Sequence, residues 1–115
     1  MKLRVAACCG FLGVGLGAFG AHALKEKLVS GGYMDAWQTA VMYHILHSVV
    51  LLALALFSSP RLGTAYWTIF TGIVVFCGSL YLMAIVGMSW LGAITPIGGI
   101  AFLAGWALIF LKSRG

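Results

Sequence analysis

Four long runs of apolar residues, separated by short polar segments, dominate the pattern of this chain. The runs cover about residues 3–24, 38–57, 65–87 and 91–111. Each supplies the roughly 20 residues that an α-helix needs to cross a hydrocarbon core about 30 Å thick. No segment shows the alternation of apolar and polar residues typical of membrane-spanning strands, and open sheet edges are not stable in lipid. The pattern predicts an all-α polytopic membrane protein, a single-domain four-helix transmembrane bundle over residues 1–115.

The composition excludes a soluble fold. Of the 115 residues, 63% are hydrophobic and only 8% are charged, with a mean hydropathy of +1.09, whereas a soluble domain carries roughly 25% charged residues. The net charge is +5. The basic residues lie near the chain ends and in the connecting segments, however, and not along one helix face as phosphate binding requires. We therefore expect no nucleic-acid partner.

The distribution of charge predicts the orientation in the membrane. Four spans place both termini and the second connection on one side. The basic residues of that side, which has no acidic residue, are Lys2, Arg4, Arg61, Lys112 and Arg114. The other side has two lysines, Lys25 and Lys27, offset by Glu26 and Asp35. Because basic residues near span ends mark the cytoplasmic face, we expect both termini to be cytoplasmic.

Glycines form smooth faces on the first and fourth spans. Four of the five glycines of the first span fall within about 80° on one helix face, and Gly13 and Gly17 have the spacing of close helix contacts in lipid. In the fourth span, Pro96 is expected to bend the helix near its outer end. We expect the glycines to pack the helices within the chain, with a homo-oligomer interface as the alternative. They are Gly10, Gly13, Gly17, Gly20, Gly98, Gly99 and Gly105.

The ends of the spans carry aromatic rings and one longer connection. Rings near the predicted interfaces are expected to act as headgroup anchors; they are Trp37, Tyr66, Trp67, Trp90 and Trp106. Residues 25–37 predict a short amphipathic segment on the outer surface, either an anchor or a lid. Asp35 is expected to cap the second span at its N-terminus.

Polar side chains inside the spans are expensive in lipid and call for an explanation. At 1.5 Å per helical residue, those of all four spans lie mainly in the outer half of the membrane. The candidate ligand-binding residues are His22, Tyr43, His44, His47, Ser79, Tyr81 and Thr95. In one interpretation these groups satisfy one another and determine which helices pair. In another they line an outward-facing pocket for an amphipathic molecule, either a lipid or a quinone-like ring.

A third interpretation is a metal site on the three histidines. His44 and His47 are three residues apart and share a helix face, which suits two ligands to one ion. His47 should lie roughly 13 Å deeper than His22, however, so a three-histidine site would need a bent helix or a re-entrant loop. No carboxylate or cysteine in the spans is placed to complete the site. We therefore predict neither a metal nor another cofactor.

An enzymatic interpretation has weak support. No span contains an acidic residue, which disfavours carboxylate acid–base chemistry. His44 or His47 could approach Ser79 across the bundle, but a serine–histidine pair without an orienting acid is a weak indication of a nucleophilic enzyme. The sequence favours a protein without catalytic activity, and the enzymatic alternative stays open.

Several motifs together resemble one known family. They are Gly17-Ala-Phe-Gly-Ala-His22, Trp37-x-Thr-Ala-x-x-Tyr43-His44-x-x-His47, Gly78-Ser-Leu-Tyr-Leu82 and Ile94-Thr-Pro-Ile-Gly-Gly99, with Ala104-Gly-Trp106. The combination resembles the small membrane-protein family called domain of unknown function 423. That family includes bacterial inner-membrane proteins and the animal transmembrane protein 256. The resemblance covers nearly the whole chain and implies four spans in a bacterial plasma membrane. It implies no reaction, substrate or catalytic residue.

The sequence thus leaves two functional hypotheses. The first is a structural or accessory membrane protein, surrounded by lipids, that acts as a homo-oligomer or within a larger membrane complex. The alternative is binding or transport of an amphipathic small molecule in the outward-facing polar pocket.

Overall fold

All regular secondary structure is helical in the residues that the computed structural model describes, 1–57 and 59–113. The helices are α1 (Lys2–Ala21), α2 (Lys25–Gly31), α3 (Met34–Phe57), α4 (Gly63–Gly72), α5 (Gly78–Val86) and α6 (Thr95–Lys112). Short 3-10 helices, η1 (Pro60–Leu62) and η3 (Ser89–Ala93), precede α4 and α6. A π-helical segment, η2 (Ile73–Cys77), joins α4 to α5 without a break.

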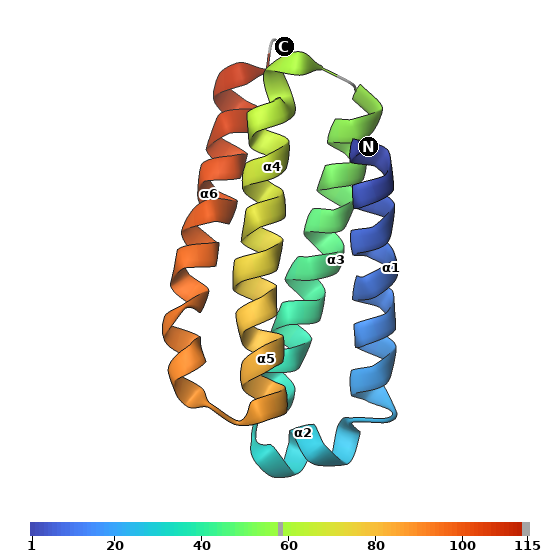
Figure 1. The fold of residues 1–115 in the computed structure, drawn as a ribbon, viewed down its shortest axis with the longest axis vertical. Helices are drawn as coiled ribbons and strands as arrows, with labels where there is room; N and C mark the ends of the chain where they lie inside the picture. Colours follow the sequence, from blue (N-terminus) through green and yellow to red (C-terminus); the bar gives the residue numbers. More distant parts are fainter. Residues whose placement is uncertain (58, 114–115) are drawn as a thin grey trace.

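Four helical segments are long and apolar enough to cross a membrane, which confirms the predicted fold class. They are Lys2–Ala21, Met34–Phe57, Pro60–Val86 and Ser89–Lys112, called spans 1 to 4 below. The spans run side by side in alternating directions, and α2 lies across one end of the molecule (Figure 1). This end is called the α2 end; the opposite terminal end holds the start of α1, the end of α6 and η1. The molecule measures 48 × 25 × 20 Å.

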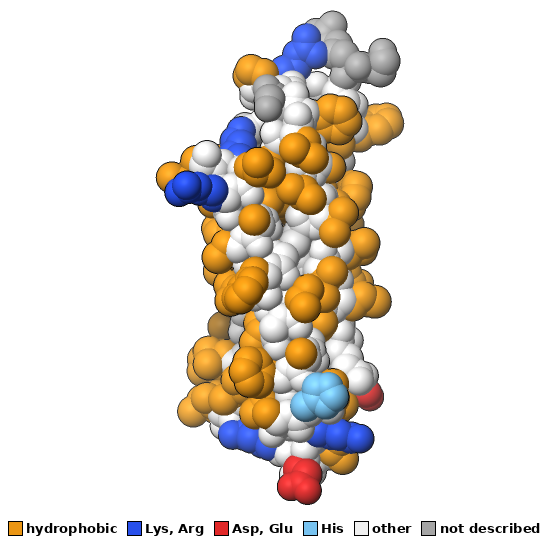
Figure 2. All heavy atoms as spheres, turned by 90° about the vertical axis from the view of Figure 1, so that its right-hand side faces the viewer, with side chains coloured by type: hydrophobic (Ala, Val, Ile, Leu, Met, Phe, Trp, Pro, Cys, Tyr) orange, Lys and Arg blue, Asp and Glu red, His pale blue; other side chains and the backbone are white. Residues whose placement is uncertain are grey.

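The surface matches this arrangement. Apolar side chains cover the middle of the face shown in Figure 2, whereas Lys and Arg gather toward both ends. Acidic side chains appear on this face only at the α2 end. A broad apolar region between two charged ends is the surface expected of a protein whose middle contacts lipid.

Two helix starts differ from the sequence predictions. Helix α3 begins at Met34, so Asp35 lies inside its first turn and the prediction that Asp35 caps the span is wrong. Helix α6 begins at Thr95, which places Pro96 in the first turn. A proline there removes no helical hydrogen bond, because the first N–H groups of a helix have no partner within it. Pro96 therefore does not lie within a continuous helix as predicted, and the fourth span is interrupted directly before it, between η3 and α6.

Spans 1 and 2 pack closely through the glycine face of α1. A Cβ atom at Gly13 would approach Ile45, and one at Gly17 would lie 3.1 Å from the Val41 side chain. At Gly20 the added carbon would overlap the indole of Trp37. Three successive turns of α1 thus lie closely against α3, and at Gly20 the approach is one that only glycine permits.

Spans 3 and 4 also pack closely at glycines. A Cβ atom at Gly105 would overlap Ile69 of α4, and one at Gly98 would collide with the backbone of Phe76. Phe76 belongs to the π-helical segment η2, whose backbone therefore lies directly against α6. By contrast, Gly10 has open space beside it, and Gly99 has only ordinary contact at 3.8 Å with the Phe76 ring.

The α2 end is closed by a small apolar cluster. Leu28 of α2 is buried together with Trp37 of α3 and Ala84 of α5. Helix α2 ends because Gly32 adopts a left-handed conformation (φ 80°), which glycine accepts without steric cost. The buried Leu28 side chain therefore fixes α2 on the ends of the spans.

Two of the predicted headgroup anchors are core residues instead. Trp37 and Tyr66 are each only 1% exposed. The Trp37 indole donates a hydrogen bond to the Leu16 carbonyl at 3.0 Å, and the Tyr66 hydroxyl donates one to the Lys2 carbonyl. Both rings therefore join span 1 to another span. Trp67 and Trp90 are exposed, as anchors should be.

Candidate functional site

His47 lies in the interior between spans 2 and 4. Its Nδ1 is 2.9 Å from the carbonyl oxygen of Tyr43, one turn earlier in α3. Its Nε2 accepts a hydrogen bond from the indole N–H of Trp106 in α6 at 3.1 Å. The ring also stacks on Phe102, with centroids 3.9 Å apart and planes 17° apart.

These two contacts determine the tautomer of His47. A carbonyl oxygen can only accept a hydrogen bond, so Nδ1 must carry the proton. An indole N–H can only donate, so Nε2 must be the unprotonated nitrogen. The imidazole is therefore neutral with both nitrogens occupied, and binding a metal through Nε2 would first require displacement of Trp106.

His44 joins spans 2 and 3. Its Nδ1 is 2.9 Å from the hydroxyl of Tyr81 in α5, and its ring lies beside Gly13 of α1, where an added Cβ atom would be 3.3 Å from the imidazole. The imidazole is 5% exposed. His44, which belongs to span 2, therefore contacts both span 1 and span 3.

A third polar contact joins spans 3 and 4. The hydroxyls of Ser79 and Thr95 are 2.7 Å apart, and the Ser79 hydroxyl also donates to the Phe76 carbonyl at 2.9 Å. This contact helps to hold α6 where its helix starts. Such hydrogen bonds between membrane helices each contribute about 0.5–1.5 kcal/mol.

The structure brings six of the seven candidate residues into these three contacts and leaves the seventh apart. His22 is exposed at the end of α1, whereas His44 and His47 are buried. Among the described residues, no three His, Cys, Asp or Glu side chains are close enough to hold a metal ion. The three histidines do not form one cluster.

The buried histidines line two different lipid-facing grooves. His44 and Tyr81 lie in a groove of about 480 Å³ between span 1 and span 3, with an otherwise apolar lining that includes Leu12 and Ile73. His47 and Trp106 lie in a groove of about 540 Å³ between spans 2 and 4. The polar side chains are thus divided between two places and do not share one pocket.

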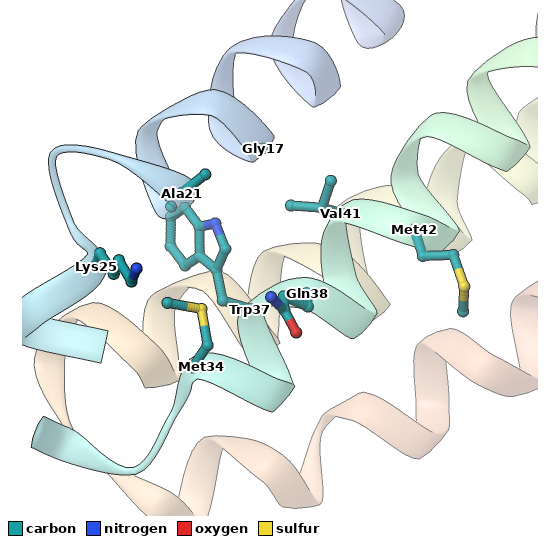
Figure 3. Close-up of a pocket in the computed structure, with 9 residues that line it drawn as sticks. Gly17, Ala21, Lys25, Met34, Trp37, Gln38, Val41 and Met42 are labelled. Carbon is teal, nitrogen blue, oxygen red and sulfur yellow. The ribbon is translucent and has the colours of Figure 1, made fainter. Parts of the chain in front are cut away.

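A further crevice lies at the α2 end, between α1 and α3. It has a volume of about 380 Å³, and the side chains that surround it are shown in Figure 3. Its lining is apolar except for Lys25 and Gln38. The lining residues are Gly17, Gly20, Ala21, Lys25, Met34, Trp37, Gln38, Val41 and Met42.

Sequence reasoning assigned the two tryptophans that complete these sites to headgroup anchoring and missed their part in the sites. Trp106 supplies the donor for His47, and Trp37 forms one wall of the α2-end crevice. The available signal was an indole N–H within or beside an apolar run, which needs a partner when it is buried. Nothing in the local spacing identifies that partner, because His47 and Trp106 are 59 residues apart.

The fold and these contacts define the class: a small integral membrane protein with four spans. Its family follows from the comparisons. A family model described as "Protein of unknown function (DUF423)" matches residues 16–99, so the chain belongs to the DUF423 family. The resemblance inferred from the sequence motifs is confirmed.

The matches between this chain and its relatives extend over most of both proteins. A UPF0382 membrane protein of Staphylococcus haemolyticus is 43% identical over 98% of this chain and 96% of its own. The UPF0382 membrane protein YwdK of Bacillus subtilis is 44% identical over 89% and 86%. The UPF0382 inner membrane protein YgdD of Escherichia coli K12 is 40% identical over 98% and 92%. No solved structure matches this chain.

Proposed function

We propose that this protein is a structural or accessory component of a bacterial plasma membrane, and that it acts as a homo-oligomer or within a larger membrane complex. The observation that carries the proposal is that the buried polar side chains bond to other side chains of the protein. His44, His47 and Ser79 each bond to a side chain of another span. They stabilise helix pairing, and their polar atoms are engaged with the protein itself.

The placement of the acidic residues also supports a role without catalysis. Glu26 and Asp35 are both exposed, in α2 and in the first turn of α3, whereas Ser79 is buried in α5. A nucleophilic enzyme needs a base near its serine and a group that orients this base. Ser79 is instead hydrogen-bonded to Thr95 and to a carbonyl oxygen.

The location and orientation are part of the proposal. The relative from E. coli is named an inner membrane protein, which supports the same location for this chain. Lys2, Arg61 and Lys112 lie in or beside elements of the terminal end, which we assign to the cytoplasm. The α2 end then faces outward.

Native mass spectrometry of the protein in lipid nanodiscs tests the proposal. We expect a homo-oligomer, or a complex with another membrane protein in fixed ratio. A protein that is monomeric and without a protein partner at every lipid composition and detergent strength would overturn it.

The groove beside His44 favours a second candidate, the binding of an amphipathic molecule with a small polar head. The groove is almost wholly apolar, and its polar groups are those of His44 and Tyr81. Extraction and mass spectrometry of molecules bound to the purified protein tests this candidate. A quinone or lipid present in equimolar amount should be lost from His44→Ala and kept by His22→Ala, whose residue lies outside the groove. An equal content in both variants would exclude the groove.

A further inference from the structure

The crevice between α1 and α3 at the α2 end has an amphipathic lining. One end carries the ammonium group of Lys25, and the carboxamide of Gln38 lies on the α3 side (Figure 3). The remaining side chains, which include Met34, Val41 and Met42, are apolar. A ligand that fits this lining has an anionic head and an apolar body.

The position of the crevice along the spans matches the boundary between headgroups and hydrocarbon. Lys25 follows the end of α1, and Met34 begins α3. From Met34 to Met42 the crevice extends over eight residues, or about 12 Å of helix. It therefore starts at the level where a membrane presents phosphate groups and continues into the level of acyl chains.

The shape of the crevice results from the packing described above. Gly17 and Gly20 have no side chain, so α1 lies close against Val41 and the Trp37 indole, and these two side chains form the inner wall of the crevice. The indole is held in place by its hydrogen bond to the Leu16 carbonyl. The crevice thus has a rigid wall, and the flexible Lys25 side chain stands at its mouth.

We propose that this crevice binds one phospholipid molecule from the surrounding leaflet. The Lys25 ammonium pairs with the lipid phosphate, the Gln38 carboxamide donates a hydrogen bond to the phosphate or the ester region, and the acyl chain lies along Val41 and Met42. A phospholipid is the ligand because it supplies an anionic group and an apolar chain at this depth and is present on every side of the protein. This site is separate from the structural role proposed above and does not depend on it.

The chain offers a matched control for Lys25. Lys27 is on the same short helix, has the same charge and is also exposed, but it does not line the crevice. It lines a separate surface hollow with Glu26 and Val29, to which Lys25 also contributes. Replacement of either lysine by alanine changes the net charge by the same amount.

The test is native mass spectrometry of the delipidated, detergent-solubilised protein titrated with two probes. Phosphatidylglycerol carries the phosphate, and diacylglycerol with the same acyl chains lacks it. The wild-type protein should bind one phosphatidylglycerol in preference to diacylglycerol. Lys25→Ala should weaken phosphatidylglycerol binding about fivefold, which corresponds to about 1 kcal/mol for one lysine near an anionic lipid. Lys27→Ala should leave it unchanged, and excess inorganic phosphate should not displace the lipid.

A third variant tests the apolar part of the site. Ala21→Phe places a ring in the crevice without a change of charge, so it should weaken the binding of both probes while the circular dichroism spectrum stays that of the wild type. Equal weakening by Lys25→Ala and Lys27→Ala would show attraction to surface charge in general and would overturn the proposal. So would equal wild-type affinity for the two probes, or displacement by inorganic phosphate.

Discussion

The indole N–H of Trp106 donates a hydrogen bond to Nε2 of His47 and thereby connects the second and fourth spans. Phe102, one turn before Trp106, stacks on the same imidazole. Together the two contacts hold the imidazole against α6. The His47 side chain thus acts as a connection between helices in the interior of the protein.

Loss of this hydrogen bond should destabilise the protein measurably. Trp106→Phe keeps an aromatic ring but leaves Nε2 of His47 without its donor. We expect the free energy of unfolding to fall by about 0.5–1.5 kcal/mol, the range found for hydrogen bonds between membrane helices. Unfolding by SDS in mixed micelles, followed by circular dichroism, measures the change. The control is Trp90→Phe, because Trp90 is 62% exposed; equal effects of the two substitutions would contradict the structural role of the bond.

A methyl group at Gly98 should be tolerated much less well than one at Gly99. At Gly98 the added carbon meets the backbone of Phe76 in η2, which cannot move aside as a flexible side chain can. We expect Gly98→Ala to cost about 1–3 kcal/mol and Gly99→Ala to change stability by less than about 0.5 kcal/mol. The same SDS titration compares the two, and similar midpoints for both variants would argue against the close packing of spans 3 and 4.

The contact of Gly20 with Trp37 makes a corresponding prediction for spans 1 and 2. Gly20→Ala should force the Trp37 indole to turn and to lose its hydrogen bond to the Leu16 carbonyl. The cost should be about 1–3 kcal/mol. Gly10→Ala, in contrast, adds its methyl group to open space and should be neutral or slightly stabilising, since alanine favours helix formation over glycine. Thermal unfolding in one detergent distinguishes the pair, and a stable Gly20→Ala variant would refute this packing.

The proposed orientation can be tested with reporter fusions. Alkaline phosphatase fused after Lys112 should be inactive and green fluorescent protein fused there should be fluorescent, because this end is assigned to the cytoplasm. Phosphatase inserted after Gly32, beside α2, should be active. The opposite pattern of activities would reverse the assignment.

Much of the fold could be predicted from the sequence because the membrane limits the choices so strongly. Four apolar runs of sufficient length can only be helices, since every backbone polar group in lipid needs a partner within the segment. The glycine face of the first span likewise indicated close helix contact before the partner helix was known. The helix starts were less predictable. Helix α3 begins at Met34, within a segment whose sequence is typical of a connection between spans. The sequence around Pro96 is compatible both with a kink inside a helix and with the first turn of one.

The site was only partly predictable for a related reason. Depth along a helix follows from residue number, so the polar side chains of the spans could be placed mainly in the outer half of the membrane. Which of them meet depends on the rotation of each helix about its axis and on which spans are neighbours. His44 and His47 share a helix face within about 60°, yet one bonds to Tyr81 and the other to Trp106.

The sequence by itself determined that this protein spans a membrane four times with helices, because hydrophobic length and backbone hydrogen bonding permit no other solution in lipid. Tertiary structure alone decided the partners: that Trp37 fills the space left by Gly20, that Tyr66 is bound to the Lys2 carbonyl, and that the polar residues lie in separate contacts. The physical reason is that side-chain pairing between helices requires a specific rotation and crossing of each pair. These are set by the packing of all four spans together and by no local pattern along the chain.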